Sequence, residues 1–505
     1  MLFKNIKDIK TKNEKKFFIE KIKLIYRIIE EYCSFNNILY SEYNEDEERA
    51  IKELLDIGII QNKDDLGIMK NLIKSEYNSL IKALSFYNEN KKESNYILKK
   101  FYNSYRKKVQ LENESNDYPT IVDLFAGAGG LSLGFVQNKY KIELANEIQE
   151  ICAQTYIFNH PELKSEKVVN DDIIKIVDYI DRYIENRDID VVIGGPPCQS
   201  FSSANRQRVI DDPRNILYKY FIKAVEKIKP KFIVMENVKG MLSVAEQVVE
   251  DFANVRVEID GEILNYDVRY NLFNSNDFSV AQSRERLIYI GIRSDVQRQF
   301  NIYAQDIIDE INNSNKHNKK YVLADALRDI KVLESPTVKN MTEVDCECTG
   351  KKVDKNIYTE RDNEYLELIN NGEWQCVITN HKARFANETN LEIFRTLEQG
   401  EDSTSEKIKH IMPYSHRNHL FKDKYYKLIA DKPCRTITAH LQMDCLSHIH
   451  PTQVRTITPR EAARIQSFPD DYVFLGPYLK TYMQIGNAVP PIMARQIAKV
   501  IHRYL

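Results

Sequence analysis

Two glycine-containing segments, each preceded by a run of β-branched and other apolar residues, constrain the fold of this chain most strongly. They are residues 120–135 and 190–202. The chain has 16 glycines among 505 residues, well below the usual ~7%, so a cluster of glycines indicates a backbone requirement. Apolar runs of this kind are typical of parallel strands covered on both faces. The two segments predict an open α/β sheet whose strands end in tight loops.

In the first segment, glycines separate a predicted strand at 121–125 from a predicted helix at 131–136. Gly127, Gly129 and Gly130 would let the backbone approach a ligand closely at the start of that helix. Alone, such a loop is a weak sign of a nucleotide-like ligand.

Acidic residues end the next two apolar stretches. Glu147 follows the glycines by about 20 residues, where such folds place the carboxylate that binds ribose hydroxyls. It could instead belong to a solvated turn. Asp172 ends a strand-like segment at 168–173 and could face an adenine amino group. The order of glycines, Glu147 and Asp172 along the chain predicts a cofactor crevice.

The second segment places Cys198 directly after Pro196 and Pro197, beyond a predicted buried strand. A buried free cysteine is usually an inert small apolar residue. Here two glycines and two prolines precede the thiol, and the polar Gln199 and Ser200 follow it. Open α/β sheets carry their chemistry at this end of the strands, so the loop is predicted to present Cys198.

Two further segments add charged groups. Glu236 lies near the end of an apolar strand at 231–238 and could be a helix cap or a proton donor with a raised pKa. Gln282, Arg284 and Arg286 fall on one side of an extended segment by period-two alternation. Two arginines on one face suit a phosphate or a carbonyl oxygen, although Arg286 could simply pair with an acid.

Together these segments resemble the C5-cytosine DNA methyltransferases, including those of bacterial restriction-modification systems. The resemblance covers residues from about 118 to 505 and leaves the first 117 unmatched. It is carried by six motifs in family order: Asp123–Leu131, Gly194–Ser202, Glu236–Val238, Gln282–Arg286, Thr458–Asp470 and Gln484–Pro491.

The resemblance implies a Rossmann-like class I sheet of the S-adenosylmethionine-dependent methyltransferases, with a smaller target-recognition domain. It also implies methyl transfer to C5 of a cytosine flipped out of a specific duplex DNA sequence. In that reaction the thiolate of Cys198 attacks C6. Glu236 holds N3 and the exocyclic amine, and Arg284 and Arg286 bind O2 of the base and the phosphate of the flipped nucleotide.

The resemblance also assigns binding residues. Cofactor contacts are expected from eight residues: Phe125, Ala126, Gly127, Gly129, Glu147, Asp172, Pro197 and Asn487. DNA contacts are expected from seven: Gln199, Ser200, Ser202, Arg206, Gln282, Arg435 and Thr436. Ile148 departs from the family, which often has an aromatic residue there, so somewhat weaker cofactor binding is expected.

Three domains are expected. Residues 118–295 form the catalytic domain, with 478–505 packing back onto it, and residues 296–477 form the target-recognition domain. Residues 1–117 contain no proline and have apolar residues at helical spacing, which predicts an all-helical accessory domain. This domain could bind DNA, pair with another protomer or hold a partner nuclease. Since the motifs lie after it, deletion of residues 1–115 is expected to leave the recognised DNA sequence unchanged.

Composition narrows the class of protein. Lys and Arg number 72 against 74 Asp and Glu, with 43% hydrophobic residues, which excludes a disordered polyelectrolyte. Neither a stretch of ~18 apolar residues nor a signal peptide is seen, so a cytoplasmic, nucleoid-associated protein is expected.

The eight cysteines are too sparse for a disulfide framework. Cys346, Cys348, Cys376 and His381 do not have a usual zinc spacing, and no metal is expected.

Two other functions remain open at this point. One is a tRNA cytosine-5 methyltransferase, against which stand the long region between the motifs and the Cys-Gln-Ser-Phe-Ser loop. The other is a DNA-binding regulator that has lost catalysis, against which stand Cys198, Glu236 and Arg286. The expected partners are double-stranded DNA and a cognate restriction endonuclease, while the target sequence and the oligomeric state stay undetermined.

Overall fold

The computed structural model describes residues 2–90, 95–197, 216–358, 360–413 and 424–505. It divides into two compact units. Unit 1 comprises residues 1–112, 157–165 and 322–486, and unit 2 comprises residues 113–156, 166–321 and 487–505. The three-domain division expected above stays a prediction, since a compact unit is not by itself a functional domain.

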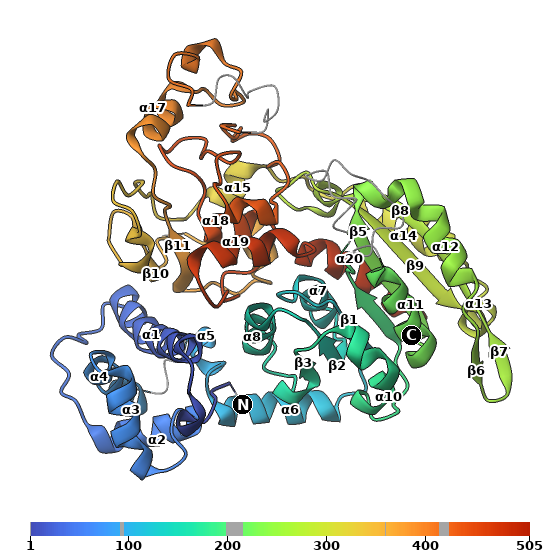
Figure 1. Ribbon diagram of the computed structural model, residues 1–505, viewed down its shortest axis with the longest axis horizontal. Coiled ribbons are helices and arrows are strands. Elements are labelled where there is room, and N and C mark those ends of the chain that lie inside the picture. Colours follow the sequence, from blue (N-terminus) through green and yellow to red (C-terminus); the bar gives the residue numbers. More distant parts are fainter. Residues whose placement is uncertain (1, 91–94, 198–215, 359, 414–423) are drawn as a thin grey trace. The chain divides into compact units, whose positions relative to one another are not determined.

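Unit 2 is built on a seven-stranded sheet with the order β3-β2-β1-β4-β5-β9-β8 (Figure 1). Its strands are β1 (Thr120–Leu124), β2 (Lys141–Asn146), β3 (Val168–Val169), β4 (Val191–Gly194), β5 (Phe232–Val238), β8 (Tyr266–Asn274) and β9 (Glu285–Arg293). The first five are parallel, and β9 is antiparallel to both β5 and β8. A separate hairpin consists of β6 (Val257–Ile259) and β7 (Glu262–Leu264).

Both faces of the sheet are buried, as the apolar runs predict. Leu287 and Tyr289 on β9 belong to a core that includes Phe221 of α11, and Ile288 and Ile290, which alternate with them along the strand, are equally buried. The helices of this part of the chain are α7 (Gly130–Val136), α8 (Glu150–Asn159), α9 (Ile173–Ile176), α10 (Ile180–Tyr183), α11 (Leu217–Ile228), α12 (Ala245–Ala253), α13 (Ser294–Phe300), α14 (Ala304–Asn315) and α20 (Pro491–Ile501).

The last helix, α20, packs against α7, which follows the first strand. The approach is close because Gly134 has no side chain. A Cβ at this position would lie 2.4 Å from the backbone nitrogen of Arg495. Tyr140 adds a hydrogen bond from its hydroxyl to the carbonyl of Ala498, at 3.0 Å.

Unit 1 combines the N-terminal helices with the region between the motifs. The helices are α1 (Lys12–Phe35), α2 (Glu47–Ile57), α3 (Leu66–Ile73), α4 (Glu76–Glu89), α5 (Tyr96–Lys99) and α6 (Asn103–Ser115). The later elements are α15 (Leu323–Leu327), β10 (Gly350–Lys355), α16 (Glu364–Ile369), β11 (Val377–Lys382), α17 (Glu388–Thr396), α18 (Pro459–Ile465) and α19 (Tyr478–Asn487).

These two parts of unit 1 share one hydrophobic core. The core of the N-terminal helices also contains Val353 of β10, Val377 of β11, and Val473 and Leu475. Helix α1 packs directly on β10, and β10 pairs with β11 in antiparallel orientation. The first hundred residues are therefore structurally continuous with the β10–β11 hairpin.

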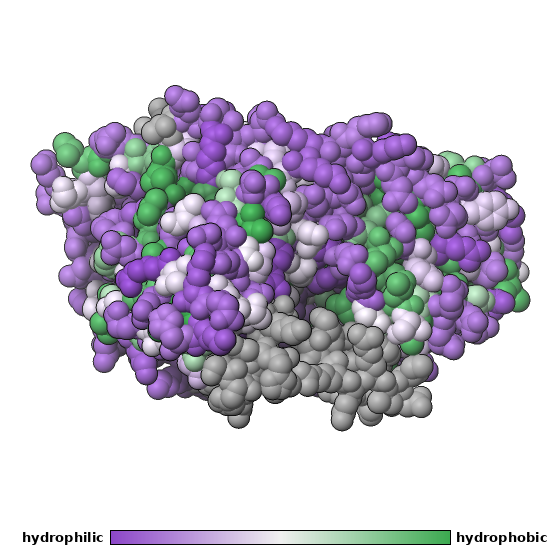
Figure 2. Space-filling view, turned by 90° about the horizontal axis from the view of Figure 1, so that it is seen from above, coloured by the Kyte–Doolittle hydropathy of each residue, from purple (hydrophilic) through white to green (hydrophobic). Residues whose placement is uncertain are grey.

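The surface is mostly polar on the face shown in Figure 2, where apolar residues form smaller patches. Among the residues described, no helix is both long and apolar enough to cross a membrane.

Candidate active site

The glycine loop after β1 has the backbone that its sequence predicts. Phe125, Gly127 and Gly129 all have positive φ, at 56°, 55° and 89°. This region is costly for Phe125, a non-glycine residue. A Cβ on Gly127 would meet nothing within 4 Å, so the loop backbone borders open space there.

A buried carboxylate holds this loop. Glu147 is 7% exposed, and its two oxygens accept hydrogen bonds from the backbone N–H of Gly127 at 2.9 Å and of Gln149 at 2.7 Å. Burial raises the pKa of the Glu147 carboxyl, while these N–H groups lower it. A carboxylate fixed beside an open glycine loop can accept further hydrogen bonds, for example from the hydroxyls of a ribose.

The third predicted strand is shorter than its sequence suggests. β3 ends at Val169, and the Asp172 carboxylate caps helix α9 by accepting from the N–H of Ile174 at 3.0 Å. Because β1, β2 and β3 are neighbours in the sheet, the glycine loop, Glu147 and Asp172 follow adjoining strand ends. Ile148, beside Glu147, is 63% exposed and offers an apolar surface.

The paired strands β5 and β9 bring Glu236 and Arg286 together. Glu236 of β5 is 8% exposed, and its Oε1 lies 2.7 Å from Nε of Arg286 on β9. A Cβ on Gly195 would lie 2.9 Å from Oε2 of Glu236, which places this carboxylate against the loop that follows β4. The Asn237 side chain donates to the carbonyl of Pro196 at 3.1 Å, so the same strand end holds the two prolines.

The other predicted catalytic and DNA-contacting residues have varied settings. Arg284 is buried, and burial holds the pKa of its guanidinium well below the usual range. Its Nη2 donates to the carbonyl of Ala488 at 3.1 Å. Gln282 is fully buried, and its carbonyl accepts from the Ser275 hydroxyl at 2.6 Å. Cys198, Gln199, Ser200, Ser202 and Arg206 lie outside the described residues.

The remaining site residues differ in exposure. Phe125 and Ala126 are half-buried, whereas Pro197 and Asn487 are exposed. Arg435 and Thr436 of unit 1 are half-buried. The Arg435 guanidinium lies over the Tyr426 ring, 4.8 Å from its centre.

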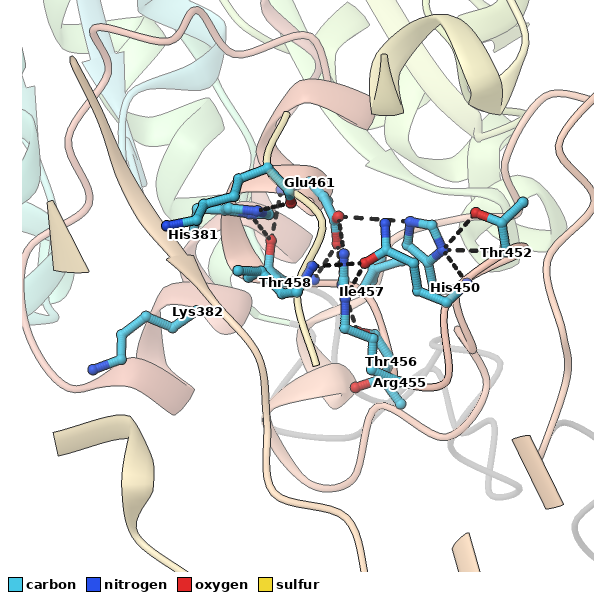
Figure 3. A network of polar contacts seen from close by, with 12 residues as sticks. His381, Lys382, His450, Thr452, Arg455, Thr456, Ile457, Thr458 and Glu461 are labelled. Atoms are coloured by element: carbon cyan, nitrogen blue, oxygen red, sulfur yellow. Dashed lines mark hydrogen bonds and ion pairs between the residues drawn. The ribbon is translucent and has the colours of Figure 1, made fainter. Parts of the chain in front are cut away.

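A buried polar network that the sequence reading missed lies in unit 1 (Figure 3). Arg455 forms a two-point ion pair with Glu461, at 2.5 and 2.8 Å. Glu461 and Thr458 complete a capping box at the start of α18. The Thr458 hydroxyl is 3.0 Å from Nδ1 of His381 on β11. The network thus joins β11 to α18. The sequence Thr-Pro-Arg-Glu at 458–461 could have predicted the capping box, because a threonine followed three residues later by glutamate is typical of a helix start.

The cysteines considered for zinc do not assemble with the histidine. The Cys346 and Cys348 sulfurs lie 3.0 Å apart. The two ring nitrogens of His381 face Thr458 and the carbonyl of Lys331. Burial lowers the pKa of His381 to about 4. Among the described residues, no group of three or more metal-binding side chains is suited to hold a metal.

The parallel sheet with an antiparallel β9, the glycine loop and the Glu236–Arg286 pair define a Rossmann-like methyltransferase fold. Residues 119–503 match the family described as C-5 cytosine-specific DNA methylase, and the chain belongs to this family. It is a DNA cytosine-5 methyltransferase, which confirms the predictions of family, fold class and activity.

Several curated relatives are similar over most of their length. The chain is 34% identical over 413 residues to type II methyltransferase M.DdeI of Desulfomicrobium norvegicum, covering 76% of this chain and 88% of the relative. It is 32% identical over 389 residues to M1.HphI of Haemophilus parahaemolyticus, covering 76% and 86%. Similarity to M.Eco47II of Escherichia coli is 30% over 476 residues, covering 90% and 96%.

One solved structure supports the fold. It is a prophage-encoded chain of E. coli described as a DNA modification methyltransferase. The TM-score is 0.54 at 23% identity, and the match covers 76% of this chain and 99% of that one.

Proposed function

We propose that this protein methylates C5 of a cytosine flipped out of duplex DNA, using S-adenosylmethionine and a covalent bond between Cys198 and C6 of the base. The observation that supports it most is the buried Glu236 carboxylate, 2.7 Å from Arg286 and directly beside Gly195. Gly195 precedes the proposed nucleophile Cys198 by three positions in the sequence.

C5 of cytosine is a poor nucleophile and must be activated before it can take a methyl group. A nucleophile of the protein provides this activation by attacking the neighbouring C6. Attack by the Cys198 thiolate forms a sulfur–carbon bond at C6 and turns the ring into an enamine. Electron density then builds on N3, which takes a proton from water. The Glu236 carboxylate accepts hydrogen bonds from protonated N3 and from the exocyclic amine, and its ion pair with Arg286 at 2.7 Å holds it in position. C5 of the enamine then takes the methyl group. Loss of the C5 proton and of the N3 proton to water, with departure of the Cys198 thiolate from C6, restores the aromatic ring.

S-adenosylmethionine fits the residues around the glycine loop. Gly127 borders open space, and Glu147 presents a buried carboxylate beside it. Glu147 would accept from the ribose hydroxyls, Asp172 from the adenine amine, and Phe125 and Ile148 would pack on the adenine. Gly129, Pro197 and Asn487 complete the proposed set. When bound, this cofactor supplies an electrophilic methyl group on its sulfonium.

We further propose that residues 296–477 read the DNA sequence and that Arg435 and Thr436 are among the contacts. A cognate restriction endonuclease is the proposed partner in the cell, because the relatives described above are named type II methyltransferases. A restriction-modification system pairs such a methyltransferase with a nuclease that cuts the same DNA sequence.

The nucleophile is tested with Cys198→Ser, with Cys348→Ser as the control because Cys348 is an exposed thiol. We expect Cys198→Ser to abolish methylation in bisulfite sequencing and Cys348→Ser to retain it. Duplex DNA with 5-fluorocytosine at the target should form a stable adduct with the parent protein and none with Cys198→Ser, since fluorine cannot leave as a proton does. Methylation by purified Cys198→Ser would refute the covalent mechanism.

The cofactor site is tested with Glu147→Ala against Glu150→Ala, a nearby exposed carboxylate on α8. A hydrogen bond to a charged group contributes roughly 1.5–3 kcal/mol. Glu147→Ala should therefore weaken S-adenosylmethionine binding in calorimetry by about tenfold or more, and Glu150→Ala should not. Equal affinities of the two variants would exclude Glu147 from the site.

A further inference from the structure

A cavity of about 170 Å³ lies within unit 1, lined by α1, by β10 and β11 and by the segment that leads into α19. Helix α1 belongs to the first 118 residues, which precede the family match. One wall of the cavity is therefore formed by a helix that lies outside the family match.

The cavity carries more positive than negative side chains. Five cationic residues line it: Lys16, Lys23, Arg27, Lys352 and Lys382. Two carboxylates line it: Glu20 and Asp345.

These carboxylates are shared among the cations. Asp345 pairs with Arg27 and, at 3.0 Å, with Lys382. Glu20 lies 3.2 Å from Lys352 and also accepts from the N–H of Gly476 at 2.9 Å. Lys23 reaches a carboxylate that does not line the cavity, Glu76, at 3.2 Å. The cavity retains a net positive charge.

Lys382 is the most enclosed of the five cations. Its side chain is 4% exposed, and its ammonium donates to the carbonyl of Val344 at 2.7 Å. Burial lowers the pKa of Lys382, and Asp345 opposes that shift. Neighbouring residues on a strand point to opposite faces. His381 points into the buried network, and Lys382 extends away from it (Figure 3).

A buried cation costs free energy unless negative charge lies close to it. Here the rigid strand holds Lys382 where its one carboxylate is shared with Arg27. An anion bound in the cavity would balance the positive charge that Asp345 alone does not balance on Lys382 and Arg27.

The start of α19 adds a second feature that favours an anion. Gly476, Pro477 and Tyr478 line the cavity, and the ten-residue helix begins at Tyr478. The first N–H groups of a helix have no partner within it, and the helix dipole favours negative charge at this end.

We propose that this cavity binds a phosphate group, supplied either by the DNA backbone or by a free phosphate compound. Guanidinium and ammonium donors arranged around a helix start match the charge and the several acceptor oxygens of a phosphate. The N-terminal helices thus take part in anion binding, which is independent of the mechanism of methyl transfer.

The test uses the full-length protein with the double variant Lys16→Gln/Lys23→Gln. Lys16 is exposed and Lys23 is half-buried, and neither belongs to the hydrophobic core of unit 1. The matched control is Lys12→Gln/Lys15→Gln, which removes the same charge from the same helix at residues that do not line the cavity. Circular dichroism establishes that both variants are folded.

Two probes distinguish the sources of the phosphate. Inorganic phosphate is titrated and followed by ³¹P NMR, and a duplex without the target sequence is titrated at several salt concentrations by fluorescence anisotropy. Each DNA phosphate contact contributes about 0.9 to the slope of log K against log salt. If DNA supplies the phosphate, the cavity variant should reduce that slope by up to about 2 relative to the control.

If a free phosphate compound is the ligand, the cavity variant should bind inorganic phosphate at least about fivefold more weakly than the control, with an unchanged DNA slope. Either result supports the site. Equal behaviour of the two variants with both probes would overturn the proposal, because the charge of α1 and not the cavity would then determine anion binding.

Discussion

Replacing Ile25 of α1 with alanine should destabilise the β10–β11 hairpin, more than three hundred residues away in sequence. Ile25 is fully buried. It belongs to the core that also contains Val353, Val377 and Leu475. A cavity opened in α1 is therefore also a defect in the packing of the hairpin.

The magnitude follows from the burial. Ile→Ala in a packed core costs about 2–5 kcal/mol. Ile68→Ala is the matched control, because Ile68 lies on α3 and is 41% exposed, and surface changes of this kind stay within about 0.5 kcal/mol. At ~1.4 kcal/mol per tenfold, the lower limit for Ile25→Ala corresponds to about 30-fold faster exchange of amides that open with the core.

Two measurements apply. The single tryptophan, Trp374, lies in unit 1. Its ring packs on Tyr358, and the Tyr358 ring contacts Phe35 at the end of α1. Urea unfolding followed by its fluorescence should show the loss of stability. Hydrogen exchange with mass spectrometry should show loss of protection in β10 and β11. If α1 loses protection while β10 and β11 keep theirs, the shared-core reasoning is refuted.

Three further predictions follow from the same structure. Deleting residues 1–115 exposes four buried side chains of the shared core (Val353, Val377, Val473 and Leu475), at ~1.5–3 kcal/mol each. Since net stabilities are ~5–15 kcal/mol, we now expect an insoluble or partly unfolded product, and a soluble truncation with cooperative unfolding would contradict this. Gly134→Ala places a Cβ 2.4 Å from the Arg495 nitrogen and should cost about 1–3 kcal/mol in thermal unfolding, whereas Gly67→Ala, with nothing within 4 Å, should be neutral or stabilising. Burial lowers the pKa of His381 to about 4 and that of His450 to about 3, so their contribution to stability is present above ~6.5 and is lost as the pH falls through these values. Trp374 fluorescence in urea should report that loss between about pH 6.5 and 4, and a pH-independent midpoint, or one equally dependent in His381→Gln, would exclude these histidines as its cause.

The sequence predicts the central sheet well because its signals are local. The apolar runs correspond to β1, β2 and β5, and the residues after the glycines form α7. Glu147 is at the end of β2, as expected, and accepts from Gly127 itself. These features can be predicted because apolar runs mark the strands, glycines mark the loop, and parallel strands bring their carboxyl ends to the same edge of the sheet.

Features that depend on contacts between distant segments could not be predicted. The Glu236–Arg286 pair requires the register of β5 against β9, which neither strand specifies alone. His381 meets Thr458 across 77 positions of sequence. Helices α3 and α4 are separated at Lys74, which adopts a φ of 47°, and no glycine or proline at this position signals the break in the sequence. The core that the N-terminal helices share with β10 and β11 is likewise visible only in three dimensions, while the expectation that deletion of residues 1–115 leaves the recognised DNA sequence unchanged stays a prediction.

The packing of α20 on α7 also has a consequence for synthesis of the chain. The ribosome makes the glycine loop and α7 early, but their covering helix spans Pro491–Ile501. The surface of α7 that α20 covers, including Gly134, therefore stays uncovered while more than three hundred further residues are translated. Unit 1, whose last residue is Gly486, can finish folding before that helix emerges. Methyl-transfer competence is thus expected to arise only after α20 has been translated, and chaperone binding to chains stalled before that point should concentrate near α7.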